Sequence, residues 1–267
     1  MTSQQYLNYI YYFTGGGVVF ESEYQALLDK ATTDGDAKPS RLQQLNQNTL
    51  LKSLKTDGIF AKLDGLWVFA TNGDSDFATY NWIDSSKFQA TKVSSPTFTT
   101  NVGFNGDGTS SHVSLNLDTT SSDVTKYTQN SASFGVYSWD DIENSDNFYP
   151  ISQSSRIRLQ RRTATTNNRI NNALPSDTQD IGTSGTGLIG LNRTTSATYN
   201  GLASNGTLTA NITGGSIALN QSSNFVINRF DTTFKSGRIG LCWVGQGLTS
   251  TEWSNFVTHV NTYIATL

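Results

Sequence analysis

Carboxylate side chains are the first candidates for chemistry in this chain, because glycoside hydrolysis needs two of them on either side of the scissile bond. None of the glutamates belongs to a strand pattern that would bring a second carboxylate to the same substrate; they are Glu21, Glu23, Glu143 and Glu252. Carboxylates from separate strands could still meet, which keeps a polysaccharide-degrading enzyme as an alternative. We expect no catalytic residue and no enzyme activity.

The run Asp140–Asp146 gathers acidic and amide side chains in what reads as a loop. Such oxygens could bind calcium. Asp- and Asn-rich turns occur throughout the chain, however, so a solvated turn explains the run without an ion. Asp34-Gly35-Asp36 resembles a fragment of a calcium-binding loop but lacks its further ligands, and we interpret it as a turn. We expect no metal site and no cofactor.

Two aromatic residues flank the acidic loop and could bind a glycan. A sugar needs an exposed aromatic platform with hydrogen-bonding side chains beside it, and Trp139 and Tyr149 stand on the two sides of the loop. Both could instead fill the core at a strand end or pack against the loop. Trp139 and Tyr149 are therefore the predicted glycan-binding residues, with core filling as the alternative.

Arginines form one basic cluster, which comprises Arg156, Arg158, Arg161, Arg162 and Arg169. In a strand, Arg156 and Arg158 would share a face. That face could meet an anionic polysaccharide, a phosphate or an acidic neighbouring subunit, or it could simply be a solvated hairpin. Aromatic residues do not alternate with these arginines, so binding of nucleic acid is not expected. We predict Arg156 and Arg158 as partner-contact residues.

The composition is that of a β-rich protein with few charges. The charged fraction is 15% and the formal net charge is −3, which argues against a general nucleic-acid binder. The single cysteine, Cys242, excludes an internal disulfide framework and reads as a small buried hydrophobe. No stretch is long and apolar enough to span a membrane, so we expect no membrane partner.

The amino-terminal third divides into an aromatic arm and two helices. The arm is apolar and ends in the glycine joint Gly15–Gly17, so we expect it to dock on a partner subunit; its predicted contact residues are Tyr9, Tyr11, Tyr12 and Phe13. Apolar residues at helical spacing predict one helix over 20–31 and a second over 39–54, with Pro39 at its first position. The expected divisions are 1–19 (arm and joint), 20–64 (helical pair) and 65–267.

The remainder reads as short strands separated by polar turns, followed by a helix. The clearest strand patterns cover 65–70, 97–104, 112–117, 131–139, 156–159, 187–191, 203–208, 225–229 and 237–241. Regular short strands without alternating helices indicate a mainly β sandwich or jelly roll. Thr249 and Glu252 form a capping box before an amphipathic helix that should lie against the sandwich.

Several short motifs occur in a recognisable order along these elements. They are Asp57–Ala70, with its Lys62-Leu63-Asp64 turn, Asn81-Trp82, Gly103-Phe104-Asn105-Gly106-Asp107-Gly108, Asn192-Arg193-Thr194 and Gly245–Thr249. Their order resembles that of the concanavalin A-like (laminin-G-like) jelly-roll family of structural proteins in tailed-bacteriophage virions. The resemblance covers the chain from about Phe20 to Leu267, and it implies a concanavalin A-like jelly roll with an N-terminal helical pair and a C-terminal amphipathic helix.

The resemblance implies a non-enzymatic virion structural protein, such as a head decoration, a fibre or a tail-associated protein that aids attachment to the host. It also implies a virion location, other virion proteins as partners, and a homo-oligomer, expected to be a trimer. The amino terminus lacks the regions of a secretory signal peptide, which agrees with assembly in the host cytoplasm. A carbohydrate-binding module that recognises a host-surface glycan is the alternative from another functional class.

Overall fold

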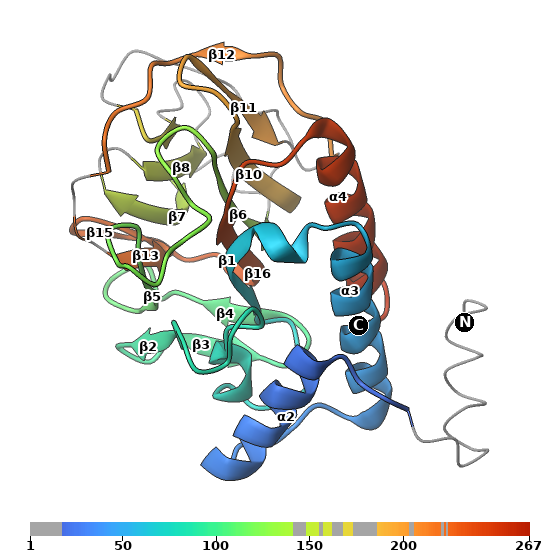
Figure 1. Ribbon diagram of the computed structural model, residues 1–267. Coiled ribbons are helices and arrows are strands. Elements are labelled where there is room, and N and C mark those ends of the chain that lie inside the picture. The colour runs from blue at the N-terminus through green and yellow to red at the C-terminus, as the bar shows by residue number, and fades with distance from the viewer. Residues whose placement is uncertain are drawn as a thin grey trace.

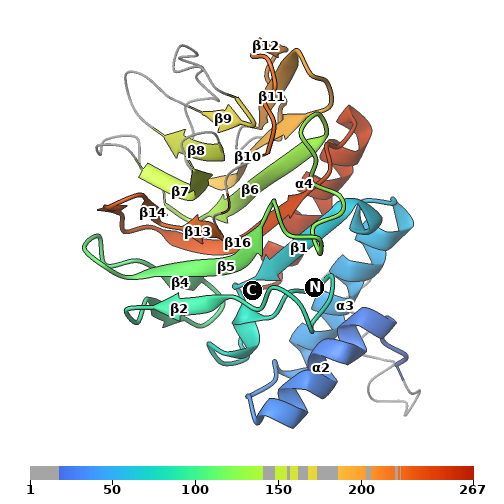
Figure 2. The same ribbon diagram turned by 60° about the vertical axis from the view of Figure 1, so that its left-hand side comes forward.

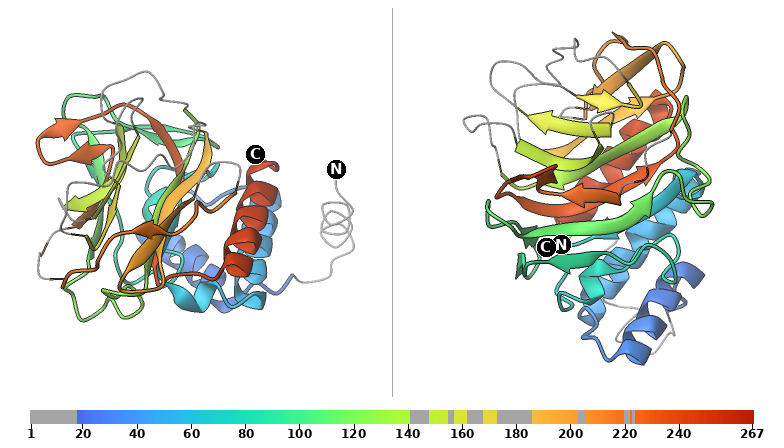
Figure 3. Two further views of the ribbon diagram at one scale, coloured as in Figure 1. Left: turned by 90° about the horizontal axis from the view of Figure 1, so that it is seen from above. Right: turned by 90° about the vertical axis from the view of Figure 1, so that its left-hand side faces the viewer.

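The computed structural model describes residues 18–140, 148–154, 157–161, 168–172, 186–202, 206–219, 222 and 224–267. It is mainly β: a jelly-roll sandwich of antiparallel sheets with an N-terminal helical pair and a C-terminal helix, as the sequence predicted. Seen from above, the helices form one layer against the strands, and the two sheets lie beyond it (Figures 1 and 3). The aromatic arm lies outside the described residues.

The eight-stranded sheet occupies the middle layer. Its order is β12-β11-β10-β6-β16-β4-β3, and β1 also pairs with β16. The strands are β1 (Leu63–Val68), β3 (Thr97–Thr99), β4 (Gly103–Asn105), β6 (Ala132–Ser138), β10 (Gly187–Arg193), β11 (Thr198–Leu202), β12 (Ile212–Thr213) and β16 (Arg238–Gly245).

The six-stranded sheet forms the outer layer, and a small hairpin projects beside it (Figure 2). Its order is β2-β5-β13-β7-β8-β9. The strands are β2 (Thr91–Val93), β5 (His112–Asp118), β7 (Phe148–Ser154), β8 (Ile157–Arg161), β9 (Arg169–Ile170) and β13 (Asn224–Ile227). The hairpin consists of β14 (Arg229–Phe230) and β15 (Thr233–Phe234).

Both faces of the eight-stranded sheet are buried, which explains the unbroken apolar runs in β1 and β16. Trp67 and its register partner Cys242 point into the core between the sheets. Leu66 and its partner Trp243 point the other way, into a second core beneath the helices. Burial raises the pKa of the Cys242 thiol, so this cysteine is a core residue and not a nucleophile.

The helices are α2 (Ser22–Asp34), α3 (Arg41–Thr56) and α4 (Ser250–Ile264), with short 3-10 turns η1 (Phe60–Lys62) and η2 (Phe77–Thr79). Helix α2 ends at Gly35, whose φ of 83° confirms the predicted turn. The capping box of α4 is confirmed, since Thr249 and Glu252 each bond the other's backbone N–H. The α4 residues Trp253 and Phe256 pack on Trp243 of the sheet.

Two local predictions in the first half were wrong. The sequence predicts Pro39 as the first residue of the second helix. In the structure Ser40 is the N-cap of α3, so Pro39 lies before the helix. The pattern over 97–104 forms two strands, β3 and β4, because Asn101 takes a left-handed φ of 63° and turns the chain back. The alternation of apolar residues does not show such a turn. The signal is the asparagine itself, because asparagine adopts a left-handed φ more readily than most residues.

The motif residues of the sequence hold backbone in place. Asp64 is buried, and its carboxylate accepts the backbone N–H groups of Thr125, Lys126 and Tyr127 at 2.7–3.1 Å. Asn81 accepts from the Leu66 N–H at 3.0 Å. Buried backbone groups must be paired, and Asp64 and Asn81 provide such partners for the loop 125–127 and for β1.

Two later motif residues act in the same way. Asn192 bonds both the N–H and the carbonyl of Leu248, at 2.8 and 2.9 Å. Arg193 is fully buried, and its guanidinium donates to the carbonyls of Ile170 and Gly214 at 2.9 and 2.8 Å. These four motif residues therefore act by holding the fold together. None of the described helices has the length and apolar character needed to cross a bilayer.

Candidate functional site

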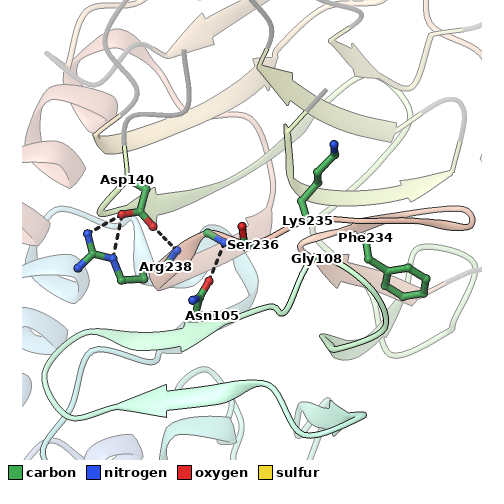
Figure 4. Close-up of a pocket in the computed structure, with 8 residues that line it drawn as sticks. Asn105, Gly108, Asp140, Phe234, Lys235, Ser236 and Arg238 are labelled. Atoms are coloured by element: carbon green, nitrogen blue, oxygen red, sulfur yellow. Dashed lines mark hydrogen bonds and ion pairs between the residues drawn. The ribbon is translucent and has the colours of Figure 1, made fainter. Parts of the chain in front are cut away.

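A hollow of about 530 Å³ opens where the ends of several strands meet the β14–β15 hairpin. Its lining comes from three separate parts of the chain: Asn105 at the end of β4 with Gly108 beyond it, Asp140 after β6, and the segment 234–238 that leads from β15 into β16. Figure 4 shows Phe234 at one end of the hollow and the paired Asp140 and Arg238 at the other, with Asn105 between them.

The backbone of Gly237 forms a fixed part of the wall. Its N–H donates to Asn105 Oδ1 at 2.7 Å, and its carbonyl accepts from Asn228 Nδ2 at 2.6 Å. Asn228 is buried and has a φ of 61°, which places its own carbonyl to accept from the Lys235 N–H at 2.9 Å. The wall is thus held by two asparagine side chains and does not depend on a ligand.

An ion pair closes one end of the hollow. Arg238 Nε donates to Asp140 Oδ1 at 2.8 Å, and the Arg238 backbone N–H donates to Oδ2 at 2.7 Å. Partial burial acts to raise the pKa of Asp140, but the hydrogen bonds from Arg238 outweigh it, so this pKa lies below its ordinary value. The carboxylate is therefore ionised at neutral pH and keeps lone pairs for further donors.

Phe234 supplies the apolar surface of the hollow. Its ring is half-buried, and it is supported from behind by two other side chains. The His112 ring lies 5.6 Å from it, and the Arg229 guanidinium lies 5.4 Å from its centroid. These two contacts hold the half-buried ring in place, and its exposed part is apolar surface for a ligand.

These groups together offer both kinds of hydrogen-bonding partner beside an aromatic ring. Asp140 and Asn105 provide acceptors, and Arg238, Ser236 and the Asn105 amide provide donors. A ligand rich in hydroxyl groups needs both, since each hydroxyl donates once and accepts up to twice. The lining contains one carboxylate among the described residues, which is fewer than a pair of acid and nucleophile requires.

The structure places Trp139 beside this hollow and not in its lining. The half-buried indole packs edge-on against Tyr137, at 5.0 Å between ring centroids, and its Nε1 donates to the Val102 carbonyl at 2.8 Å. The partner in the predicted glycan platform, Tyr149, belongs to β7, and its side chain lies outside the described residues. A platform made of Trp139 and Tyr149 therefore stays a prediction.

The arginine cluster is described in part. Arg158 on β8 pairs in register with Arg169 on β9, and its guanidinium lies 5.1 Å from the Phe230 ring of the hairpin. The other predicted contact residue of this cluster, Arg156, lies outside the described residues, as do Tyr9, Tyr11, Tyr12 and Phe13 of the arm. Contacts of these residues with a partner stay predictions.

An acidic group elsewhere comes nearest to a metal site in the part of the chain that the structure describes. Carboxylate oxygens of Asp36, Asp74 and Asp76 lie within 4.8 Å of one another. Each already serves the protein: Asp74 accepts from the Phe77 N–H at 2.8 Å, Asp76 pairs with a lysine at 2.8 Å, and Asp36 accepts the hydroxyl of Tyr80. We assign this group a structural role.

Sequence reasoning missed Phe234, Arg238 and Asn105 as site residues, and it placed Asp140 only in an acidic loop. A signal was present. In the segment 229–238, two phenylalanines alternate with basic and small polar residues, which is unusual in a chain with so few charges. No local pattern shows that this segment contacts residues 105–108 and 140, because that contact is created by the sheet topology.

Comparisons with known proteins give distant likenesses of shape. No family model matches the chain, and no curated protein matches it. Trypanosoma rangeli sialidase in complex with sialic acid is similar over 83% of this chain and 40% of its own, with 11% identity and a TM-score of 0.48. The binding domain of botulinum neurotoxin serotype D is similar over 78% of this chain and 52% of its own, with 12% identity and a TM-score of 0.43.

A third structure is domain 4 of a GH43 extracellular arabinanase from Geobacillus stearothermophilus, in complex with arabinotriose. The likeness covers 73% of this chain and 98% of that domain, with 14% identity and a TM-score of 0.39. The chain thus spans about two fifths of the sialidase and about half of the toxin domain. With TM-scores below 0.5, these likenesses carry no inference about a ligand of this chain.

Proposed function

We propose that this protein is a non-enzymatic carbohydrate-binding module, and that its binding site is the hollow between Phe234 and the Asp140–Arg238 pair. The observation that carries the proposal is the combination found there: an aromatic ring, a clamped carboxylate and guanidinium, and an amide around one hollow. The apolar face of a sugar ring packs on an aromatic side chain, while its hydroxyl groups take the polar partners at the rim.

Preorganisation supports binding in this hollow. Gly237 is held on both sides by asparagines, and Asp140 is bonded by both the side chain and the backbone of Arg238. Polar groups fixed before the ligand arrives lose little freedom when it binds. This matters for a sugar, because each of its hydrogen bonds replaces one to water and gains only about 0.5–1.5 kcal/mol.

The described glutamates support a binding function over a hydrolytic one. Glu252 pairs with Lys62 and caps α4, while Glu21 and Glu23 share Lys55 on the helical side of the molecule. Each therefore has a structural partner away from the hollow. Glu143 lies outside the described residues. Release of reducing sugar from a bound polysaccharide would contradict the non-enzymatic part of the proposal.

A glycan array probed with the full chain tests the function directly. Bacterial surface polysaccharides are the first set to include, and the Phe234→Ala variant should lose at least about tenfold in affinity for any glycan bound. Phe60→Ala is the matched control, since it removes a half-buried phenylalanine of η1 that does not line the hollow. Equal binding by wild type and Phe234→Ala would place the site elsewhere, with Trp139 and Tyr149 as the next candidates.

We propose, as a second and compatible function, a structural role in a bacteriophage virion. Its support is the ordered set of motifs between Phe20 and Leu267, and a carbohydrate-binding site would suit a decoration, fibre or tail protein that attaches to a host surface. Purified virions analysed by mass spectrometry should contain the protein in near-stoichiometric copies. Its absence from particles, with free protein in the lysate, would refute the virion role and leave the carbohydrate site untouched.

A further inference from the structure

His112 lies behind the hollow and connects it to the rest of the sheet. The side chain is 5% exposed at the start of β5. Its Nε2 is 3.2 Å from Nη1 of Arg229 on β14, and its Nδ1 is 3.2 Å from the Ser110 carbonyl. An arginine can only donate and a carbonyl can only accept, so these contacts fit a neutral ring with its hydrogen on Nδ1.

The surroundings of the ring favour this neutral form. Three neighbouring strands place residues beside His112. The charged Arg229 comes from β14, the uncharged Phe234 from β15, and Val93, the register partner of His112, from β2. Burial lowers the pKa of the His112 ring below its ordinary value, and the Arg229 charge adds to this effect.

The remaining charges near the ring are directed elsewhere. Lys92 of β2 pairs with Asp76 at 2.8 Å. Asp107, in the loop before β5, accepts the N–H groups of Ser110 and Ser111, both at 2.8 Å. Lys235, which follows Phe234, lines the hollow. Within the described chain, no carboxylate contact compensates a positive charge on His112.

The hairpin that carries Phe234 has little structure of its own. β14 and β15 each have two residues, and their register is Arg229↔Phe234 and Phe230↔Thr233. A two-stranded hairpin is at best marginally stable in water. The Lys235 N–H bond to the Asn228 carbonyl closes its base, and β14 packs beside β7. Side chains add to this support: Arg229 and Phe234 contact His112, and Phe230 contacts Arg158.

We infer that His112 is a proton-operated latch on the carbohydrate site. Protonation of Nε2 turns an acceptor into a donor that faces the Arg229 N–H, and it places a positive charge on the buried ring 3.2 Å from the half-exposed Arg229 guanidinium. The contact breaks, the hairpin loosens, and Phe234 leaves the wall of the hollow. The inference rests on the proposed function, because it describes how that same site is regulated.

The sign of the effect follows from linkage. The ring has an ordinary pKa of about 6.5 in the unfolded chain and a lower one in the closed, folded state. The latch is therefore at full strength above about pH 6.5, weakens as the pH falls below this value, and is lost as the pH passes through the lower, folded-state pKa. The site is closed around Phe234 at neutral pH and opens in acid.

Two measurements on the full chain test the latch without any ligand. The sequence has two histidines, His112 and His259, so NMR of the ring protons can follow both in one titration. Hydrogen exchange of residues 229–235, corrected for the intrinsic effect of pH, reports hairpin opening. We expect their protection to fall at least about tenfold between pH 7.5 and pH 5 as His112 titrates, while β6 and β16 stay protected.

Variants separate the latch from general unfolding. His112→Gln removes the titrating group and should abolish the pH-dependent loss of protection. Arg229→Gln keeps an N–H donor for Nε2 but removes its charge, so it should raise the pKa of His112 and shrink the effect. Unchanged protection of residues 229–235 while His112 titrates, or the same pH dependence in His112→Gln, would overturn the inference.

Binding to the glycan array at pH 7.5 and pH 5 distinguishes this inference from the proposed function. The latch is supported by a glycan whose binding to the wild type weakens at least about tenfold from pH 7.5 to pH 5, while its binding to His112→Gln, whatever its strength at pH 7.5, changes less than about threefold over the same range. Equal binding at both pH values overturns the latch and leaves the function standing. Hairpin opening in acid with no glycan bound at pH 7.5 refutes the function and leaves the latch standing.

Discussion

At the residue scale, the side chains that form recognisable motifs and those that line the hollow are largely different sets. Asp64, Asn81, Asn192 and Arg193 are buried and spend their hydrogen bonds on backbone groups. Such residues can be found from sequence because their patterns are short and local. Asn105 is an exception, because it belongs to the Gly103–Gly108 motif and also lines the hollow. The site as a whole could not be found in this way, because the sheet topology brings Asn105, Asp140 and Phe234 together.

Asp64→Ala tests the structural role of one motif residue. The change leaves the buried N–H of Tyr127 and its two neighbours without an acceptor, so we expect a loss of about 2–4 kcal/mol in the free energy of unfolding. Urea denaturation followed by circular dichroism measures it. Asp123→Ala is the control, because the Asp123 side chain is 51% exposed and pairs with Lys87 at the surface; its cost should stay below about 1 kcal/mol. Similar costs for the two variants would contradict the assignment.

At the element scale, the sequence predicted the type of most helices and strands but missed some of the turns that divide one strand pattern into two strands. The α4 capping box and the strand over 112–117 were confirmed because their signals are local. The division of 97–104 into β3 and β4, and the small β14–β15 hairpin, depend on single left-handed residues such as Asn101 and Asp231. One residue of that kind leaves the apolar periodicity unchanged while it reverses the chain.

Trp243 shows how helix and sheet are fitted together. Its ring lies across Gly135 of β6 and Gly190 of β10, where a Cβ atom would come within 2.4 and 2.7 Å of the ring. The two glycines therefore leave the space that the indole fills beneath α4. The pairing Trp243↔Gly135 and Gly135↔Gly190 is a feature of register that only the folded sheet contains.

Gly190→Ala tests this fit. The added methyl group must displace Trp243 or the Phe134 carbonyl, each 2.7 Å away, so we expect destabilisation of about 1–3 kcal/mol and a lower melting temperature. Gly215→Ala is the matched control, since its Cβ would meet nothing within 4 Å, and it should change stability by less than about 0.5 kcal/mol. A Gly190→Ala protein as stable as Gly215→Ala would show that the Trp243 packing is wrong.

Thr249→Ala tests the cap that begins the terminal helix. Thr249 accepts the Glu252 N–H, and Glu252 in turn accepts the Thr249 N–H at 2.8 Å. Loss of the hydroxyl should cost about 0.5–2 kcal/mol. Thermal unfolding measures the loss, and Thr258→Ala in the middle of the same helix controls for the change of residue. No difference between these two variants would argue against the capping box as a source of stability.

At the scale of the whole molecule, the three layers decide which surfaces can bind. Helices α3 and α4 cover one face of the eight-stranded sheet, and the six-stranded sheet covers the other, as Figure 3 shows. The hollow lies at the end of the sandwich, where β4, β6 and β16 meet the hairpin. The layer arrangement was predictable from strand and helix periods; the location of the site was not, because it depends on which strand ends become neighbours.

Self-association is expected to depend on the aromatic arm. Tyr9, Tyr11 and Phe13 belong to an apolar stretch that the sequence predicts to dock on a partner subunit. Deletion of residues 1–17 should leave a folded monomer with an unchanged melting temperature, while the full chain forms an oligomer, expected to be a trimer, in light scattering at high concentration. A full chain that is monomeric at all concentrations, or a truncated chain that unfolds, would contradict this.

The central claim is that the hollow beside Phe234 holds a sugar. The most direct measurement is a crystal structure of the full chain with the glycan that binds most strongly on the array. We predict a sugar ring packed on Phe234, with hydroxyl groups hydrogen-bonded to Asp140 and Arg238. A sugar bound elsewhere on the protein, with this hollow holding only solvent, would contradict the account.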